Sequence, residues 1–255
     1  MNELAHHANA FMLVLIRTSG VVMTAPVFGA AMVPMPVKAA FVLAVSLLLA
    51  PTLPAGAAVP AGLAAFGVAA LRELGIGLVM GFAAMLVFGA FQVAGGIAGN
   101  QMGFTMGELV DPLLEEEETS TLTQFHYVLA MLLFLAINGH HWFLQALQAS
   151  FREVPLGGMQ LTAALGQGLT GRFVELFAAG VKMAAPAICV LTLVTIALAM
   201  LARAAPLLNM LMISITLRVA VGLLLMGVLL PYVCRMGSSL FLEMRNDLGL
   251  LIRAM

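Results

Sequence analysis

The sequence is built from long apolar runs separated by short polar or proline-bearing breaks. Six runs stand out: Phe11 to Phe28, Ala39 to Ala50, Leu74 to Ala98, Phe125 to Leu147, Pro186 to Leu201 and Val219 to Cys234. A helix needs roughly 20 apolar residues to cross a hydrocarbon core of about 30 Å. Leu74 to Ala98, which holds no charged residue, and Phe125 to Leu147 meet that length. The pattern predicts an all-α membrane protein, with the other four runs too short or too charged for a clean crossing.

Turn-forming residues mark the expected connectors between these runs. They gather at Pro34 and Pro36, from Pro51 to Pro60, at Gly157-Gly158 and in the polar stretch from Gln167 to Arg172. A further polar island, Asn138-Gly139-His140-His141, interrupts the middle of the fourth run.

Composition supports the membrane interpretation and removes several functional classes. Hydrophobic residues make up 62% of the chain and charged residues only 9%, whereas soluble domains average about half and a quarter. Eleven basic and twelve acidic residues leave a net charge of -1, so no basic field exists to hold nucleic acid. The two cysteines form no metal-type or disulfide pattern.

Basic side chains lie within or beside the apolar runs, at Arg17, Lys38, Lys182 and Arg218. Each costs about 2.5 to 3.5 kcal/mol at the middle of a membrane helix, so partners or water must compensate. Lys38 and Arg218 lie near run ends, from where the side chain can snorkel to water. Arg17 lies deeper, which predicts pairing or packing against another subunit.

Four glycines recur every fourth residue at Gly95, Gly99, Gly103 and Gly107, which predicts one stripe along a continuing helix. Such a stripe allows close helix packing. The alternative is a bendable element whose Met102, Phe104 and Met106 line a passage.

Half of the acidic residues follow at once, at Glu108, Asp111 and Glu115 to Glu118. This density cannot lie in hydrocarbon, so the segment must lie in water or in a solvated cavity. Asp111-Pro112 predicts a turn at its start. The segment is either a solvated connector or a charged, mobile element beside a pore.

Covalent chemistry finds little support in the sequence. Adjacent His140 and His141 point about 100° apart on a helix and cannot both address one metal ion, so hydrogen-bonded packing is the favoured interpretation. No serine nucleophile elbow, zinc-binding helix motif or phosphate loop is present. We therefore expect no enzyme activity, no metal and no cofactor.

Several strings together resemble the FliR family of flagellar export-apparatus proteins. They are RTSGVVMTAPVFG at residues 17–29, NQMGF at 100–104, Asp111-Pro112, QFHYVLAMLLFLAINGHHWFLQAL at 124–147 and RAAPLLNML at 203–211. The resemblance extends over nearly the whole chain, in the order of the family. Departures are Leu113-Leu114 with four glutamates after the Asp-Pro pair, and Ser214 and Thr216 before Arg218.

The resemblance implies a subunit of the flagellar type III export gate in the bacterial inner membrane, at the flagellar basal body. Partners would be FliP-type and FliQ-type subunits, a FlhB-type protein, membrane lipid and unfolded export substrates. The fold would consist of long, bent helical hairpins, FliP-like over residues 1–150 and FliQ-like over residues 151–255. The loop at 102–121 would plug the pore through Met102, Gly103, Phe104, Met106, Glu108, Asp111 and Pro112.

The remaining polar residues would have intersubunit or structural roles: Arg17, Asn138, His140, His141, Lys182, Arg203, Asn209 and Arg218. Two alternatives stay open. One is the export gate of a virulence injectisome, which shares the fold. The other is a small-solute secondary transporter, in which Arg17, Lys182 and the histidines form a site at the membrane midplane.

Overall fold

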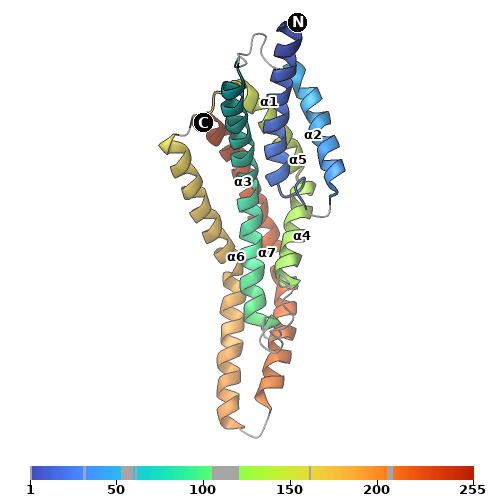
Figure 1. Ribbon diagram of the computed structural model, residues 1–255. Helices are drawn as coiled ribbons and strands as arrows, with labels where there is room; N and C mark the ends of the chain where they lie inside the picture. Colours follow the sequence, from blue (N-terminus) through green and yellow to red (C-terminus); the bar gives the residue numbers. More distant parts are fainter. Residues whose placement is uncertain are drawn as a thin grey trace. The chain divides into compact units, whose positions relative to one another are not determined.

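The computed structural model describes residues 2–30, 33–52, 60, 62–104, 121–160, 162–205 and 209–255. Regular structure in these residues is helical, and Figure 1 shows the helices in chain order. They are α1 (Asn2–Thr24), α2 (Met35–Leu49), a 3-10 helix η1 (Ala50–Thr52), α3 (Leu63–Met102), α4 (Thr121–Ala136), α5 (Gly139–Glu153), α6 (Ala163–Ala204) and α7 (Met210–Ala254). The predicted all-α class is confirmed for this part of the chain.

Four helical segments are long and apolar enough to cross a bilayer: Met35–Thr52, α3, α6 and α7. The bent pair α4 and α5 forms a fifth candidate if it is counted as one broken span. The expectation that Ala39 to Ala50 is too short was wrong, because the helical segment there extends from Met35 to Thr52. The same expectation for the last two apolar runs was also wrong, because α6 and α7 continue through Pro186 and Pro231 and through their embedded charges. Membrane helices tolerate proline where neighbouring groups satisfy the freed carbonyl.

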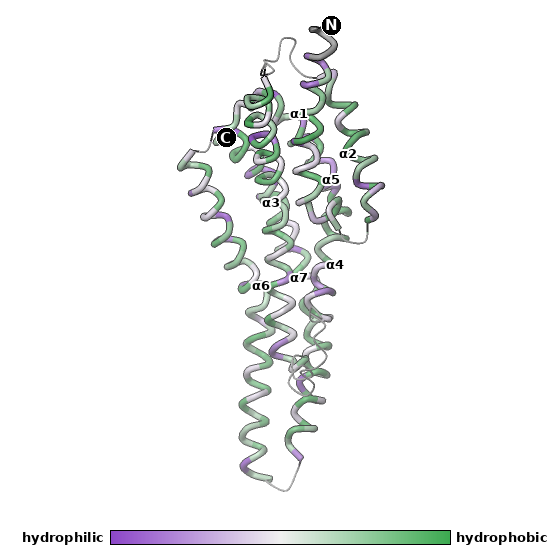
Figure 2. Tube along the Cα trace, in the orientation of Figure 1, coloured by the Kyte–Doolittle hydropathy of each residue, from purple (hydrophilic) through white to green (hydrophobic). Residues whose placement is uncertain are grey.

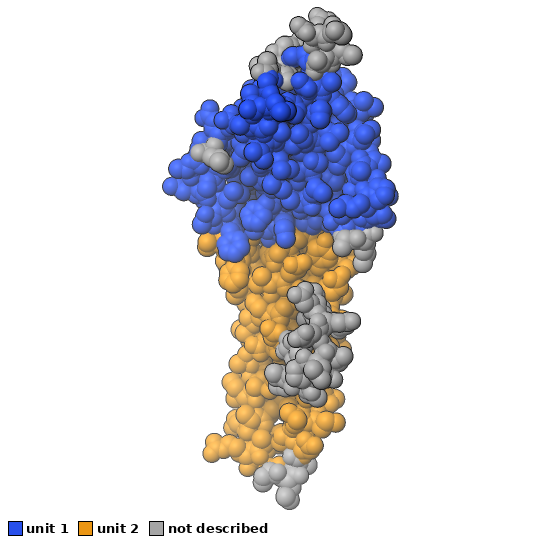
Figure 3. Space-filling model, in the orientation of Figure 1, with its two compact units in different colours: residues 1–87, 135–173, 241–255 blue, residues 88–134, 174–240 orange. Residues whose placement is uncertain are grey.

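The chain folds into two compact units, each assembled from separate stretches of sequence (Figure 3). Unit 1 comprises residues 1–87, 135–173 and 241–255, and unit 2 comprises residues 88–134 and 174–240. Helices α3, α6 and α7 each contribute to both units. The predicted division at residue 150 into a FliP-like and a FliQ-like part stays a prediction.

Each unit has its own apolar core. In unit 1 the fully buried side chains include Leu13, Ile76, Met80, Leu147 and Phe241. In unit 2 they include Phe88, Phe91, Met102, Phe134, Met183 and Leu191. Phe88 and Phe134 of unit 2 pack edge to face with ring centroids 5.8 Å apart, the geometry that aromatic pairs prefer.

The polar island at Asn138 breaks the fourth apolar run, so that run is two helices and not one straight span. Asn138 adopts a left-handed conformation with φ of 58°, which asparagine tolerates better than most residues. The backbone amide of Asn138 donates to the Leu135 carbonyl at 3.0 Å, and its backbone carbonyl accepts from the His141 amide at 3.0 Å. These bonds close the turn between α4 and α5.

Two of the expected connectors have opposite outcomes. Gly157 lies in a turn after α5 with φ of 71°, so the prediction of a turn there is confirmed. The polar stretch from Gln167 to Arg172 lies inside α6, so the prediction of a connector there was wrong. Within unit 1, Arg172 of this helical segment forms an ion pair with Asp247 of α7. The polar segment thus has a charged partner on a neighbouring helix.

Candidate functional site

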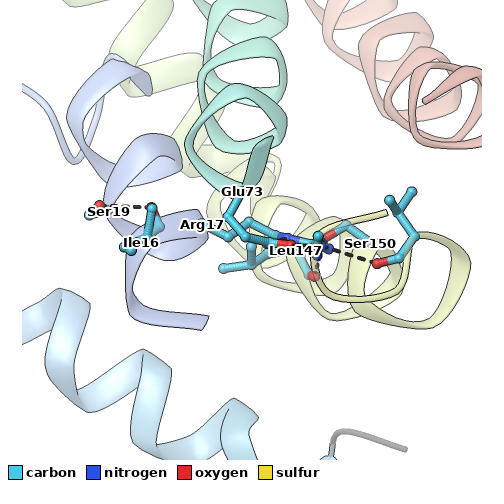
Figure 4. A network of polar contacts seen from close by, with 8 residues as sticks. Ile16, Arg17, Ser19, Glu73, Leu147 and Ser150 are labelled. Carbon is cyan, nitrogen blue, oxygen red and sulfur yellow. Dashed lines mark hydrogen bonds and ion pairs between the residues drawn. The ribbon is translucent and has the colours of Figure 1, made fainter. Parts of the chain in front are cut away.

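The most polar buried feature of unit 1 is an ion pair between Arg17 of α1 and Glu73 of α3 (Figure 4). Both side chains are fully shielded from solvent. The Nε of Arg17 donates to Oε2 of Glu73 at 2.5 Å, and Nη2 donates to Oε1 at 3.0 Å. This two-pronged geometry is the strongest form of arginine–carboxylate contact.

The remaining donors of Arg17 bond to α5 and the turn after it. Nη1 donates to the Ser150 hydroxyl at 3.1 Å, and Nη2 donates to the Val154 carbonyl at 3.1 Å. The guanidinium carbon lies 4.2 Å from the centre of the Phe151 ring, within reach of a cation–π contact. Glu73 also accepts a hydrogen bond from the Gly157 amide at 2.7 Å. The network therefore joins α1, α3, α5 and the turn at Gly157.

Glycines bring α1 and α3 close enough for this network to form. A Cβ on Gly77 would overlap the Arg17 carbonyl and lie 2.9 Å from Gly20 Cα and from the Val21 amide. A Cβ on Gly20 would lie 3.0 Å from the Leu74 carbonyl. The residue numbers of the contacting positions increase in the same direction along both helices, so α1 and α3 run parallel. Glu73 lies one turn before Gly77 on the same helix face, so the crossing places its carboxylate beside Arg17.

Most hydrogen-bonding groups of this network are already used, which leaves little to bind a ligand. Arg17 uses four of its five N–H groups on Glu73, Ser150 and Val154. Of the two roles expected for Arg17, the structure satisfies pairing within the chain. Sequence reasoning missed Glu73, Ser150 and the Gly20–Gly77 crossing. A signal for Glu73 existed, since a charge in an apolar helix requires an opposite charge.

Unit 2 contains an apolar pocket among its four helices. Its lining includes Ala94, Ala98 and Met102 of α3, His126 of α4, Met183 and Leu191 of α6, and Leu225 and Met226 of α7. His126 is buried, and its Nδ1 lies 2.8 Å from the Leu122 carbonyl. The pocket thus presents methionine and aliphatic surface with one histidine, which suits packing and not acid–base chemistry.

The expected glycine stripe is only partly present. Gly95 and Gly99 are buried in α3, and a Cβ on Gly95 would lie 2.7 Å from the Leu122 carbonyl of α4. The helix ends at Met102, and Gly103 has φ of 87°, so the expectation that the stripe continues in the same helix was wrong. The predicted residues Met106, Gly107, Glu108, Asp111 and Pro112 lie outside the described residues, and Phe104 is exposed.

The adjacent histidines begin α5. His140 and His141 have ring centroids 4.2 Å apart, and the Nδ1 of His140 is shielded from solvent with no partner in the described chain. Over the ranges that the structure covers, no three metal-binding side chains converge. The arrangement offers neither a metal site nor a nucleophile with a base.

The predicted polar residues of α6 and α7 lie at several positions. Lys182 and Arg203 are exposed on α6, and Arg203 occupies the last turn, where the helix dipole favours a cation. Asn209 precedes α7, and its side-chain oxygen lies 3.5 Å from the Met212 amide, as in an N-cap. Arg218 lies within α7, and its Nε is shielded from solvent without a hydrogen bond to any described residue.

The helices of unit 2 leave much of their apolar surface uncovered. In the most apolar 18-residue stretch of α3, 56% of the stretch is buried within this chain. The corresponding buried share is only 22% in α6 and 6% in α7. Figure 2 shows apolar residues along both α6 and α7. The exposed large apolar side chains of α6 and α7 in unit 2 include Val174, Phe177, Val181, Val190, Leu193, Ile196, Met200, Leu201, Leu211, Met212, Ile213, Leu217, Leu223, Leu224, Val228, Leu230 and Tyr232.

Comparisons with known proteins point to one family. Residues 8–244 match the model of the bacterial export proteins, family 1. The flagellar biosynthetic protein FliR of Escherichia coli strain K12 is 32% identical over 94% of this chain and 92% of its own length. FliR of Bacillus subtilis strain 168 is 28% identical over 100% and 96%. The surface presentation of antigens protein SpaR of Shigella flexneri is 32% identical over 58% and 56%.

Proposed function

The chain belongs to the bacterial export proteins of family 1, and we propose that it is a subunit of the export gate of a flagellar type III secretion system. Its site would be the inner membrane at the base of the flagellum. The proposal is carried by the match over residues 8–244, with FliR relatives that align along almost their full length. The buried, internally bonded polar network and the uncovered apolar helices support a structural, channel-forming role.

The proposed partners are FliP-type and FliQ-type subunits, together with a FlhB-type protein. With them the chain would form a channel for unfolded export substrates. The loop at 102–121 would enter the pore as a plug at rest and move aside for cargo. Its acidic composition supports a place in water, since six carboxylates would be costly in lipid.

Arg218 supports the proposal that protein, and not lipid alone, covers α7. Its guanidinium Nε is shielded from water but lacks a hydrogen bond within the described chain. Leaving a charged donor unpaired in apolar surroundings costs more than pairing it. Between residues 174 and 240 the chain has one acidic residue, Glu175, and four basic ones, Lys182, Arg203, Arg218 and Arg235. We propose that a partner helix supplies a carboxylate to Arg218.

This proposal predicts how Arg218 variants behave when the chain is produced together with its FliP-type and FliQ-type neighbours. Arg218→Met retains an apolar side chain but loses the charge, and it is expected to recover several-fold less of both partners on affinity purification. Arg218→Lys keeps the charge and should recover most of them. Arg253→Met, at an exposed position in the last turn of α7, serves as the matched control. Equal recovery from all three variants would refute the proposed contact.

The two alternative functions fare differently. The SpaR match supports kinship with injectisome export proteins, but it covers only 58% of this chain, whereas the FliR matches of Escherichia coli and Bacillus subtilis cover 94% and 100% of it. The solute-transporter alternative needs Arg17 free to bind a ligand. Because Arg17 is buried and already bonded to Glu73, Ser150 and Val154, the structure disfavours that role.

A further inference from the structure

Met102 is the last residue of α3, yet it is one of the most deeply buried side chains of unit 2. Only 1% of its surface is exposed, although terminal helical residues are usually the first to fray. It forms a cluster with Leu122 of α4 and Leu191 of α6, against which Val221 and Met226 of α7 pack. One side chain at the end of α3 therefore contacts the other helices of unit 2.

A glycine on α7 makes room for this side chain. A Cβ on Gly222 would lie 2.5 Å from Cε and 2.6 Å from Sδ of Met102, closer than real Cβ contacts allow. Gly222 is buried in the interior of α7, where glycine costs about 1 kcal/mol relative to alanine. We infer that Gly222 forms a notch for the thioether of Met102.

The residue after Met102 turns the chain out of the helix. Gly103 has φ of 87°, a conformation that favours glycine, and its amide donates to the carbonyls of Gly99 at 3.1 Å and Asn100 at 3.2 Å. These are the bonds of a helix C-terminus closed by a left-handed residue. Met102 is thus the last side chain through which the end of α3 can be fixed.

We propose that Met102 and the Gly222 notch form a positioning contact that sets where the chain leaves α3. The inference rests on the proposed function, because the segment that follows is the one assigned to the pore. Methionine suits this task, since its unbranched thioether fills an irregular gap and can leave it at low cost. Met102 and Gly222 both line the apolar pocket of unit 2, together with Ala94, Ala98 and Leu225.

Nitroxide labels at Phe104→Cys and Ser239→Cys test the contact in the assembled complex, with Cys189 and Cys234 replaced by serine. Both label positions are exposed in the single chain, and Ser239 lies outside the apolar surface that partners are proposed to cover. The distance distribution between the labels is expected to be narrow in the parent protein and broader or shifted in Gly222→Ala. Gly227→Ala is the matched control, because a Cβ there meets nothing within 4 Å. It should leave the distribution unchanged.

Ion conductance of the reconstituted complex shows whether the Met102–Gly222 contact positions the segment that follows α3 or only packs α3 against α7. Gly222→Ala is expected to raise resting conductance several-fold toward that of a variant lacking Gly103 to Thr121, whereas Gly227→Ala is not. Met102→Ala, which removes the side chain without a clash, should show the same two changes if Gly222→Ala fails to assemble.

An unaltered distance distribution in both Gly222→Ala and Met102→Ala would overturn the inference. A shifted distribution with unchanged conductance would also overturn it, provided that the deletion of Gly103 to Thr121 raises conductance. If the deletion itself leaves conductance unchanged, the plug in the proposed function is wrong, and with it the consequence assigned to this contact.

Discussion

Replacement of Arg17 by methionine is expected to destabilise the protein by about 3 to 5 kcal/mol, the cost typical of removing one member of a buried ion pair. The Glu73 carboxylate would stay buried, with the Gly157 amide at 2.7 Å as a remaining partner. The Ser150 hydroxyl and Val154 carbonyl would lose their guanidinium donors as well. Thermal unfolding of the purified assembly, with the yield of folded chain as a second readout, measures the effect.

Two further variants show whether the loss comes from an uncompensated charge. Arg17→Met combined with Glu73→Met removes both charges, so it should cost less than the sum of the two single changes. Arg72→Met alters the neighbouring arginine, whose Nη1 makes an exposed hydrogen bond to the Gly157 carbonyl at 2.9 Å. It should cost less than about 1 kcal/mol. An Arg17→Met protein as stable as Arg72→Met would contradict the structural role of the network.

The second large effect is expected at the crossing of α1 and α3. Alanine at position 77 would place its Cβ against the backbone of Arg17, Gly20 and Val21. Backbone atoms of two packed helices cannot rotate away as a side chain does, so the helices must separate. We expect a loss of about 3 kcal/mol, at the upper end of the usual range for overpacking. The same separation would weaken the Arg17–Glu73 bonds one turn away.

Gly67→Ala provides a control in the same helix and the same unit. A Cβ at Gly67 meets nothing within 4 Å, and the residue is exposed in α3. Because alanine is favoured over glycine in helices, this change should stabilise the protein by about 0.5 to 1 kcal/mol. Thermal unfolding of both variants side by side gives the comparison. Equal and small effects at Gly67 and Gly77 would show that the helices do not approach closely.

Local features were the part of this structure that the sequence could predict. Apolar runs marked the helices, because a lipid-exposed or buried helix must be apolar over most of its length. The run from Phe125 to Leu147 was expected to cross as one span, whereas the left-handed Asn138 divides it into α4 and α5. The match of the quoted motifs to the FliR family was confirmed by the comparisons.

Contacts between distant segments could not be predicted in the same way. The buried charge at Arg17 required a partner, but periodicity within one run cannot choose Glu73 over another acid. Glycine spacing misled as well, because the regular series from Gly95 stops at the end of α3, whereas the close crossing uses Gly20 and Gly77 from separate helices. The ends of α6 and α7 were misplaced because charges and prolines were read as boundaries of helices that pass through them.

The central claim is that partner subunits cover the exposed apolar surface of α6 and α7. Photo-crosslinking from Leu193 of α6 and Leu224 of α7, which are 67% and 71% exposed in the single chain, tests it directly. In native membranes both positions are predicted to yield adducts with small hydrophobic export-gate proteins. Adducts with lipid alone at both positions, on a chain that purifies as a stable monomer, would contradict the account.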